Sequence, residues 1–546
     1  MPASRSTTRS HSALKNLVYS ILLLAIFALP AWEQQTPPSP LSGSQSSSAA
    51  SAQQPNIPSA PASPSPSAGA SQQDVPGAGV AVQEKQPTQP QKPRQEPSEE
   101  PSGPITKQQA QELFRSVDQI LHFASTNTGL PIKHEVKRKL ITRESVQNYV
   151  EKRLQEDKDT QRLQRSQAIL VKFGLLPPDF DLHSEFVRVL REQVAAYYDA
   201  KKKTVYMLDW LPPDQQKPVL AHELTHALQD QQVGLEKWEL AGGREDGNPL
   251  PDNQEEVVEE AQAARDAVTE GQAMIVFLDY SLAPLGIDVL KAPEVVDAMR
   301  SEMGKAQDSP QFSASPIYLQ ESLLFPYTFG TDFVRSVLTK KGKQAAYAGM
   351  LENPPIDTRQ VMEPETYLRN EKVPPIPIPD LNQLIGPDYE RYDFGGMGEF
   401  DVYLLMKQYV PDDDAKKIYT HWRGGYYLAA HAKNAPKNQI ALLYFSRWDS
   451  PESAAGFAKV YEGYTPKRYP QWKAAGAPPS GRGGNPDPAT WWEGPVEDRV
   501  YVEQSGSDLL ILESFDSNST ERLTKALLLK ATALDTNTPA TSQKPN

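Results

Sequence analysis

Apolar residues recur every three or four positions over most of the chain from Thr106 onward, which is the spacing of one helix face. Thr106 and Gln109 have the residue types and spacing of a capping box, so a first helix is expected to begin there. The same periodicity predicts helices at about 145–173, 183–194 and 254–280. From about Gly424 apolar and polar residues alternate, which predicts strands. The chain is therefore expected to be α+β, mostly helical with a small α+β module near its end.

The alternating region predicts four strands and two helices in the order ββαββα. The strands are expected at 426–432, 439–445, 499–503 and 509–513, and the helices at 450–464 and 519–529. Between 282 and 395 the pattern predicts helices joined by proline-rich loops, which include 324–327 and 373–377.

Residues 195–208 contain two short β-rich runs on either side of a polar turn, which predicts a β-hairpin. The hairpin carries three tyrosines, Tyr197, Tyr198 and Tyr206. An exposed edge strand in such a hairpin can bind a substrate backbone through its free N–H and C=O groups. A purely structural hairpin fits the same residues, so both interpretations stay open from the sequence.

Residues 222–226 read H-E-L-T-H, the pattern of a zinc hydrolase. On a helix His222 and His226 lie one turn apart on the same face, so both imidazoles can reach one ion at about 2.0–2.1 Å. Glu223 stands where it can accept a proton from water on the ion. Pro218 suits a first helical position and Gly234 a helix end. Two surface histidines on an amphipathic helix are the alternative, and the agreement of helix, pair and glutamate disfavours it.

A third ligand has to come from elsewhere, because no histidine follows at short spacing. The acidic helix expected at 254–280 is the nearest source of carboxylates. Within it Glu270 borders the apolar stripe, and the adjacent Gly271 would let another helix approach closely. A carboxylate directed toward a core needs a counter-charge, which zinc supplies. Glu260 is the closest competitor.

The N-terminal fifth of the chain predicts a location outside the cytoplasm. Basic residues precede an apolar run of 16 residues from Leu17 to Trp32, so 1–32 is expected to be a signal peptide or an uncleaved membrane anchor. Residues 33–105, rich in Pro, Ser, Gln and Ala, are expected to form a disordered spacer, and 536–546 a disordered tail. The expected location is exported, either secreted or in the cell envelope, with membrane contact only through the N-terminal segment.

Composition excludes several classes of protein. The net charge of −13 and the pI near 5.3 argue against a nucleic-acid partner. Because the chain has no cysteine, a disulfide framework, an iron–sulfur cluster and a catalytic thiol are impossible.

These motifs support a family resemblance. Residues 222–230 resemble the active-site helix of the gluzincin, or thermolysin-like, metallopeptidases. More closely, the chain resembles a group of uncharacterised bacterial exported proteins in which a Y-Y-D hairpin, an H-E-L-T-H-A-L-Q-D-Q helix and an E-G-x-A helix follow one another. The matching residues are 197–199, 222–231 and 270–273.

The resemblance extends through 325–327 and 354–358 and covers about 106–529. It implies that Glu270 is the third zinc ligand, although it lies farther from His226 than in thermolysin. It also implies a zincin-like core at 106–300, a helical extension at 301–423 and the α+β module at 424–535. The segment 362–365, Met-Glu-Pro-Glu, departs from the group, which has a histidine before the proline.

The resulting hypothesis is a zinc metalloendopeptidase with one Zn²⁺ per chain on His222, His226 and Glu270, and with Glu223 as general base. Four further residues are candidates for orienting a ligand or stabilising an oxyanion. Asp230, one turn beyond His226, is a candidate for orienting the free ring nitrogen of that histidine, and Tyr197, Tyr198 and Tyr206 are candidates for the oxyanion. The partner would be a protein or peptide substrate, and residues 106–195 could cover the site as a propeptide. The alternative is a non-catalytic envelope binding protein built on the same core.

Overall fold

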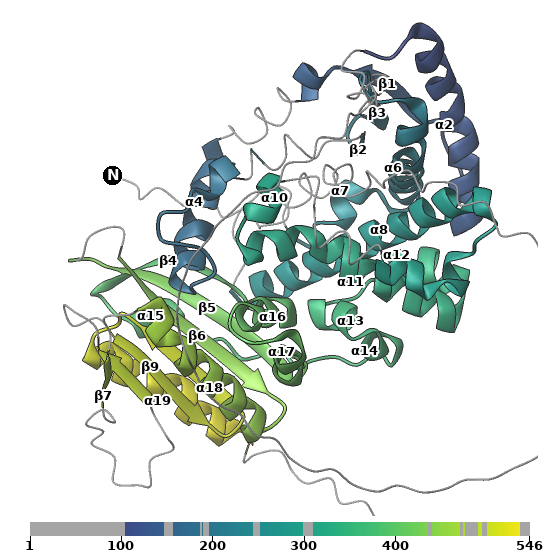
Figure 1. The fold of residues 1–546 in the computed structure, drawn as a ribbon. Coiled ribbons are helices and arrows are strands. Elements are labelled where there is room, and N and C mark those ends of the chain that lie inside the picture. The colour runs from purple at the N-terminus through teal and green to yellow at the C-terminus, as the bar shows by residue number, and fades with distance from the viewer. Residues whose placement is uncertain are drawn as a thin grey trace, which may run out of the picture. The chain divides into compact units, whose positions relative to one another are not determined.

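The computed structural model describes most of the chain after residue 103, in one unit. The described residues are 104–146, 157–185, 188, 196–243, 252–298, 310–434, 439–469, 473–475, 490–493 and 499–535. The segments expected at 1–32 and 536–546 lie outside them, as does the spacer up to residue 103. In the described part helices and two sheets are combined, so the expected mixed α+β architecture is confirmed (Figure 1).

Helices make up most of the first part. They are α2 (Lys107–Thr128), α4 (Asp157–Lys172), α6 (Pro213–Val233), α7 (Leu235–Trp238), α8 (Asp252–Leu282), α10 (Pro310–Ala314) and α11 (Ile317–Lys341). Shorter helices then precede and interrupt the second sheet: α12 (Met350–Glu352), α13 (Thr358–Met362), α14 (Pro364–Leu368), α15 (Leu381–Ile385), α16 (Glu399–Lys407) and α17 (Asp412–Tyr419). Helices α18 (Pro451–Arg468) and α19 (Ser517–Asp535) belong to the C-terminal module. None of the described helices is long and apolar enough to span a bilayer.

A capping box begins α2, as the sequence predicts. The Thr106 hydroxyl accepts from the Gln109 N–H at 3.2 Å, and the Gln109 side chain accepts from the Thr106 N–H at 2.8 Å. Both orphan donors are thereby satisfied, which fixes the first turn. The apolar face of α2 then packs on α6, the helix that carries the H-E-x-x-H residues.

The small first sheet contains the expected hairpin and one strand that the sequence did not reveal. Strands β2 (Tyr197–Asp199) and β3 (Thr204–Leu208) pair antiparallel, which confirms the hairpin. Strand β1 (Lys137–Ile141) adds to β3 in parallel, so the order is β1-β3-β2 and β2 lies at an edge. Both hairpin strands, β2 and β3, lie against α6.

Helices α8 and α11 approach closely at a pair of glycines. A Cβ atom added to Gly271 would lie 2.2 Å from the Gly330 carbonyl oxygen, and one added to Gly330 would lie 2.3 Å from the Ala267 oxygen. The backbones of the two helices are therefore in contact, as the position of Gly271 predicts. This contact holds the part of α8 that carries Glu270.

Two predictions about prolines are wrong. Pro218 is inside α6, which begins at Pro213. The segment 324–327 is the middle of α11 rather than a loop, although it contains Pro326. Proline inside a helix costs about 3 kcal/mol. Here the flanking Phe325 and Tyr327 are buried, and their packing offsets that cost. The proline-rich segment 373–377 does lack regular structure, as expected.

The second sheet has the order β4-β5-β6-β10-β9-β8-β7. Its strands are β4 (Tyr389–Gly396), β5 (Trp422–Ala432), β6 (Ile440–Trp448), β7 (Lys473–Ala475), β8 (Thr490–Glu493), β9 (Arg499–Ser505) and β10 (Asp508–Glu513). The four predicted strands and the two helices α18 and α19 are confirmed. The module nevertheless begins before Gly424, because α16 and α17 separate the unpredicted strand β4 from its neighbour β5.

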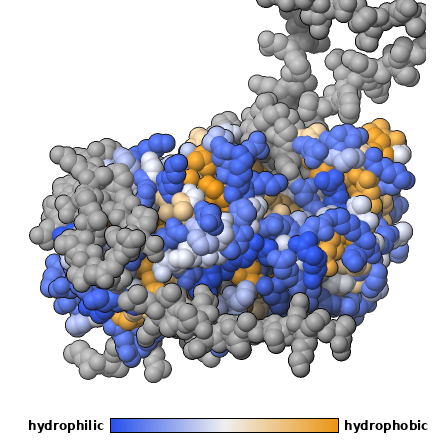
Figure 2. Space-filling model, turned by 90° about the horizontal axis from the view of Figure 1, so that it is seen from below, coloured by the Kyte–Doolittle hydropathy of each residue, from blue (hydrophilic) through white to orange (hydrophobic). Residues whose placement is uncertain are grey.

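Both faces of the second sheet are buried. Along β5, Tyr427 and Ala429 belong to the large core shared with the helical part, while Tyr426 and Leu428 belong to a second core beneath α15 and α19. Outside these cores, hydrophilic residues cover most of the described surface in the face that Figure 2 shows, and apolar residues form small separate patches.

Candidate metal centre

Helix α6 holds two histidines inside the protein. His222 is completely buried and His226 is 6% exposed, so neither lies on a solvated face. Their rings are nearly perpendicular, at 82°, with the two Nε2 atoms 3.0 Å apart. The surface-histidine interpretation of this helix is therefore wrong.

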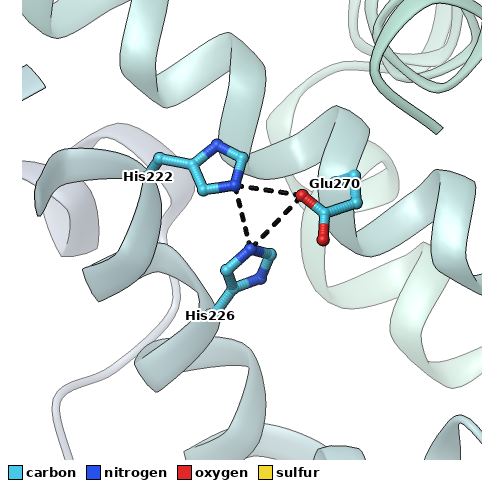
Figure 3. Close-up of side chains that lie close together, drawn as sticks. All are labelled: His222, His226 and Glu270. Atoms are coloured by element: carbon cyan, nitrogen blue, oxygen red, sulfur yellow. Dashed lines mark hydrogen bonds and ion pairs between the residues drawn. The ribbon is translucent and has the colours of Figure 1, made fainter. Parts of the chain in front are cut away.

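Helix α8 brings Glu270 to the same point (Figure 3). Its Oε2 atom lies 3.0 Å from His222 Nε2 and 3.5 Å from His226 Nε2. Donor atoms bound at 2.0–2.1 Å to one tetrahedral ion are about 3.3–3.4 Å apart, so the three observed spacings fit such an ion closely. Among the described residues this is the one group of three or more potential ligands gathered tightly enough to hold a metal.

A relay of two glutamines fixes the tautomer of His226. Gln272 Nε2 donates to the backbone oxygens of Ala346 and Tyr347, at 2.7 and 3.1 Å. Its Oε1 accepts from Gln229 Nε2 at 3.0 Å, and Gln229 Oε1 lies 2.8 Å from His226 Nδ1. Because Gln229 presents an oxygen, Nδ1 carries a proton, so Nε2 is the nitrogen that can bind an ion when it is deprotonated.

Gln229 occupies the role that the sequence analysis gave to Asp230. The Asp230 carboxylate instead accepts from the Tyr198 hydroxyl at 2.7 Å, from Lys203 Nζ at 2.6 Å and from the Leu235 N–H at 3.1 Å. It therefore ties the β2–β3 hairpin to the end of α6. Asp230, four residues after His226, points to the hairpin, whereas Gln229, three residues after His226, faces α8.

Glu223 is anchored through only one of its carboxylate oxygens. Oε2 accepts from the Tyr198 N–H of β2 at 2.8 Å. Oε1 is buried and has no hydrogen-bond partner among the described residues. The carboxylate is thus held in a fixed direction with one oxygen left for a further donor.

The three hairpin tyrosines are engaged in the hairpin. Tyr197 and Tyr206 stack on each other with ring centroids 4.7 Å apart. The Tyr198 hydroxyl donates to Asp230, and burial together with this contact raises the pKa of Tyr198 far above its usual value. In this structure the Tyr198 hydroxyl is therefore directed to Asp230, and an oxyanion role for the three tyrosines stays a prediction.

Tyr327 is a neighbour of the centre that the sequence analysis did not single out. It comes from the middle of α11 and is 1% exposed. Its ring lies nearly parallel to the His222 imidazole, with centroids 6.2 Å apart. Tyr327 belongs to the Phe325-Pro326-Tyr327 segment that the sequence analysis noted. Because that segment was predicted to be a loop, Tyr327 was not considered as part of the site.

Burial and mutual contact separate the pKa values of the four groups. Burial lowers the pKa of His222 to about 4 and raises that of Glu223 to about 8. Burial opposes charge on His226 and Glu270 too, but their contact with each other raises the pKa of His226 to about 9 and lowers that of Glu270 to about 2. Glu270 is thus a carboxylate, the form in which it can bind a cation.

The competitor Glu260 lies at another place on α8. Its Oε2 accepts from the Thr358 N–H at 3.0 Å and from the Thr358 hydroxyl at 2.7 Å. The structure therefore brings Glu270, and not Glu260, to the histidine pair. In chemical terms the centre offers two imidazoles and a carboxylate for one ion, with a second carboxylate, Glu223, beside them.

The comparisons with known proteins gave one match, and it lies in the C-terminal part of the chain. A family described as "Domain of unknown function (DUF8575)" matches residues 389–524, which span β4 to α19 and contain none of the four residues of the centre. No curated protein and no solved structure matches the chain.

Proposed function

We propose that the chain is a zinc-dependent metallopeptidase with a zincin-like core. The observation that carries the proposal is the convergence of His222 Nε2, His226 Nε2 and Glu270 Oε2 at spacings that suit one tetrahedral ion. Two histidines and a glutamate form the ligand set of several catalytic zinc sites. The relay through Gln229 supports the same assignment, because it directs a nitrogen lone pair inward.

The chemistry supplied by a zinc ion at this position is polarisation of a carbonyl and acidification of water. Glu223 Oε1 then has the role of general base: it takes a proton from the attacking water and passes it to the leaving amine nitrogen. The Tyr198 N–H keeps this carboxylate in place through Oε2.

A peptide is the substrate that the surroundings favour. Strand β2 pairs with β3 on one side, and no described strand pairs with its other edge. That edge faces the centre, since the Tyr198 N–H reaches Glu223 from it. An extended backbone can add to such an edge. Because the four groups are at most 6% exposed, a flexible chain is a better substrate than a folded surface.

The alternative, a non-catalytic envelope binding protein, fits two observations less well. A structural zinc site is closed by four protein ligands, whereas three gather among the described residues. A structural site also needs no base, yet Glu223 Oε1 lies buried beside the ligands with no hydrogen-bond partner among those residues. Export, with membrane contact only through residues 1–32, remains part of the proposal, because the basic start and apolar run support it.

The test is zinc content combined with hydrolysis of an unfolded protein such as casein. The full chain should hold one zinc and cleave, and a chelator should stop cleavage until zinc is returned. Glu223→Gln should keep the zinc and lower the rate roughly a hundredfold or more. Glu236→Gln, the same change on exposed α7, is the control. One bound zinc without hydrolysis would favour the binding protein, and no zinc would refute both functions.

A further inference from the structure

A cavity of about 90 Å³ lies where the helical part meets the C-terminal module. One wall is α4 and the N-terminal half of α8, and the other is the end of β4 with α16 and β5. The cavity therefore joins the region matched by the family of unknown function to the helix that carries Glu270.

The lining combines acids and aromatic rings. The acids are Glu259, Glu260, Asp266 and Asp401, and the rings are Phe173, Tyr318, Phe400 and Tyr427. None of the lining residues is a lysine, arginine or histidine. Aromatic faces attract cations as carboxylates do, so both parts of the lining favour a positively charged occupant.

Neutral donors fix three of the carboxylates in place. Glu259 Oε2 accepts from the Gly396 N–H at 3.1 Å, and Asp401 Oδ2 from the Gly398 N–H at 2.9 Å. Glu260 is held by Thr358. Burial and the neighbouring Asp401 raise the pKa of Glu260 to about 8, which is the result expected where carboxylates face one another.

The occupant suited to this lining is larger than a metal ion. Metal ligands converge on one point, and the described residues contain one such group, at His222, His226 and Glu270. Three of the cavity acids come from α8 and the fourth, Asp401, comes from α16, and they do not converge as metal ligands do. A guanidinium or ammonium group on a carbon chain suits such a lining, because its donors point in several directions and its stem packs on rings.

The cavity and the metal centre share one face of α8. Glu259, Ala263, Asp266 and Glu270 are separated by four, three and four residues, the spacing of a single helix face. At 1.5 Å per residue Asp266 lies about 6 Å, and Glu259 about 16 Å, from Glu270 along the axis. An extended peptide covers those distances in about two to five residues.

We propose that this cavity binds an organic cation, namely the side chain of an arginine or lysine that lies a few residues from the cleaved bond of a peptide substrate. The identity of the occupant as part of a substrate rests on the proposed function. The affinity of the cavity for the cation does not, because it depends on residues that are separate from the metal centre.

The first experiment measures the cavity alone. Acetyl-arginine amide is titrated by calorimetry into the full-length Glu223→Gln protein, with acetyl-citrulline amide as the neutral ligand of the same shape. Arginine should bind at least about tenfold more tightly. Glu259→Gln and Asp401→Asn keep an acceptor oxygen and should each weaken binding about tenfold. Asp413→Asn, which removes an exposed acid from α17, should change nothing.

The second experiment measures peptides on the active protein. Alanine-rich peptides with one arginine at successive positions should be cleaved best when the arginine is two to five residues from the cleaved bond, and Asp401→Asn should remove that preference. Binding of acetyl-arginine amide without any peptide hydrolysis would retain the cation site and refute the peptidase. Equal binding of arginine and citrulline, or full affinity in both cavity variants with unchanged zinc content and melting temperature, would overturn the cation site.

Discussion

Two carboxylates on the same helix are in opposite electrostatic surroundings. Glu270, near the middle of α8, lies between two imidazoles, which lower its pKa to about 2 despite its burial. Glu260, almost three turns earlier, contacts the neutral Thr358 and faces Asp401, and its pKa rises to about 8. The charged form of Glu270 is stabilised by the imidazoles, while that of Glu260 is opposed by burial and by Asp401.

The difference shows that neighbours from distant segments, and not the helix, decide what an acid does. Both residues follow the same helical periodicity and both border the core. Glu270 meets α6, and Glu260 meets α13 and the start of α16. The candidate metal centre and the proposed cation-binding cavity can therefore lie on one helix face without sharing a residue.

The largest expected effect comes from substituting the two carboxylates and measuring zinc binding. Glu270→Gln and Glu260→Gln make the same chemical change on the same helix. Glu270→Gln should lower zinc affinity more than about a hundredfold, since it removes a charged ligand, whereas Glu260→Gln should retain the metal. Zinc stoichiometry after dialysis against a mild chelator gives the answer. Retention of zinc by Glu270→Gln together with its loss from Glu260→Gln would show that the helix is in a different register.

A second substitution tests the packing that holds Glu270. In Gly271→Ala the new Cβ would meet the Gly330 oxygen at 2.2 Å, so α8 and α11 have to separate. We expect a loss of roughly 1–3 kcal/mol in unfolding free energy, with weaker zinc binding. Gly456→Ala in α18 is the matched control: its Cβ meets nothing, and it should stabilise the protein by about 0.5–1 kcal/mol. Chemical denaturation compares the two, and equal effects would refute the close helix contact.

The sequence was informative where a short pattern determines the structure. The H-E-x-x-H spacing, the apolar stripe beside Glu270 and the glycine at 271 are all local, and the structure brings those residues together. The strands near the end of the chain were also predicted from a local pattern, the alternation of apolar and polar residues. The failures involve distant partners. Strand β1 pairs with a strand more than sixty residues away, and β4 reaches its partner only after α16 and α17.

The orientation of single side chains was also beyond the sequence. Gln229 and Asp230 both follow His226 by about one turn, and an acid is the more familiar partner for a ligating histidine. The choice depends on Gln272 of α8, which accepts from Gln229, and on Tyr198 and Lys203, which engage Asp230. Likewise, the continuation of α11 through Pro326 depends on burial, which a local proline signal does not contain.

The glutamine relay leads to a smaller effect at the metal centre. Gln229→Leu should lower zinc affinity about 10–100-fold, because His226 loses the acceptor that sets its tautomer. Gln232→Leu, on the same helix and less buried, should leave the affinity near that of the original chain. Competition with a fluorescent zinc chelator measures both. An unchanged affinity in Gln229→Leu would show that the relay does not direct the imidazole.

The smallest effect concerns a carboxylate outside both sites, Glu399 at the start of α16. It is completely buried, and burial with the nearby Glu363 and Asp357 raises its pKa well above the usual value, although Arg359 lies 3.8 Å away. The folded protein therefore keeps a proton that the unfolded chain releases above about pH 4.5. Stability from this group is complete below that pH and is lost as the pH rises toward the folded pKa.

Glu399→Gln stays uncharged at every pH, so it should avoid this loss. We expect little difference from the original chain near pH 4.5 and a melting temperature roughly 2–4 °C higher at pH 8. Glu452→Gln, an exposed change on α18, should show no such widening with pH. Melting curves between pH 4.5 and 8 test this. A variant that loses stability as steeply as the original chain would show that Glu399 is ionised in the folded protein, and that Arg359 compensates it much as the imidazoles compensate Glu270.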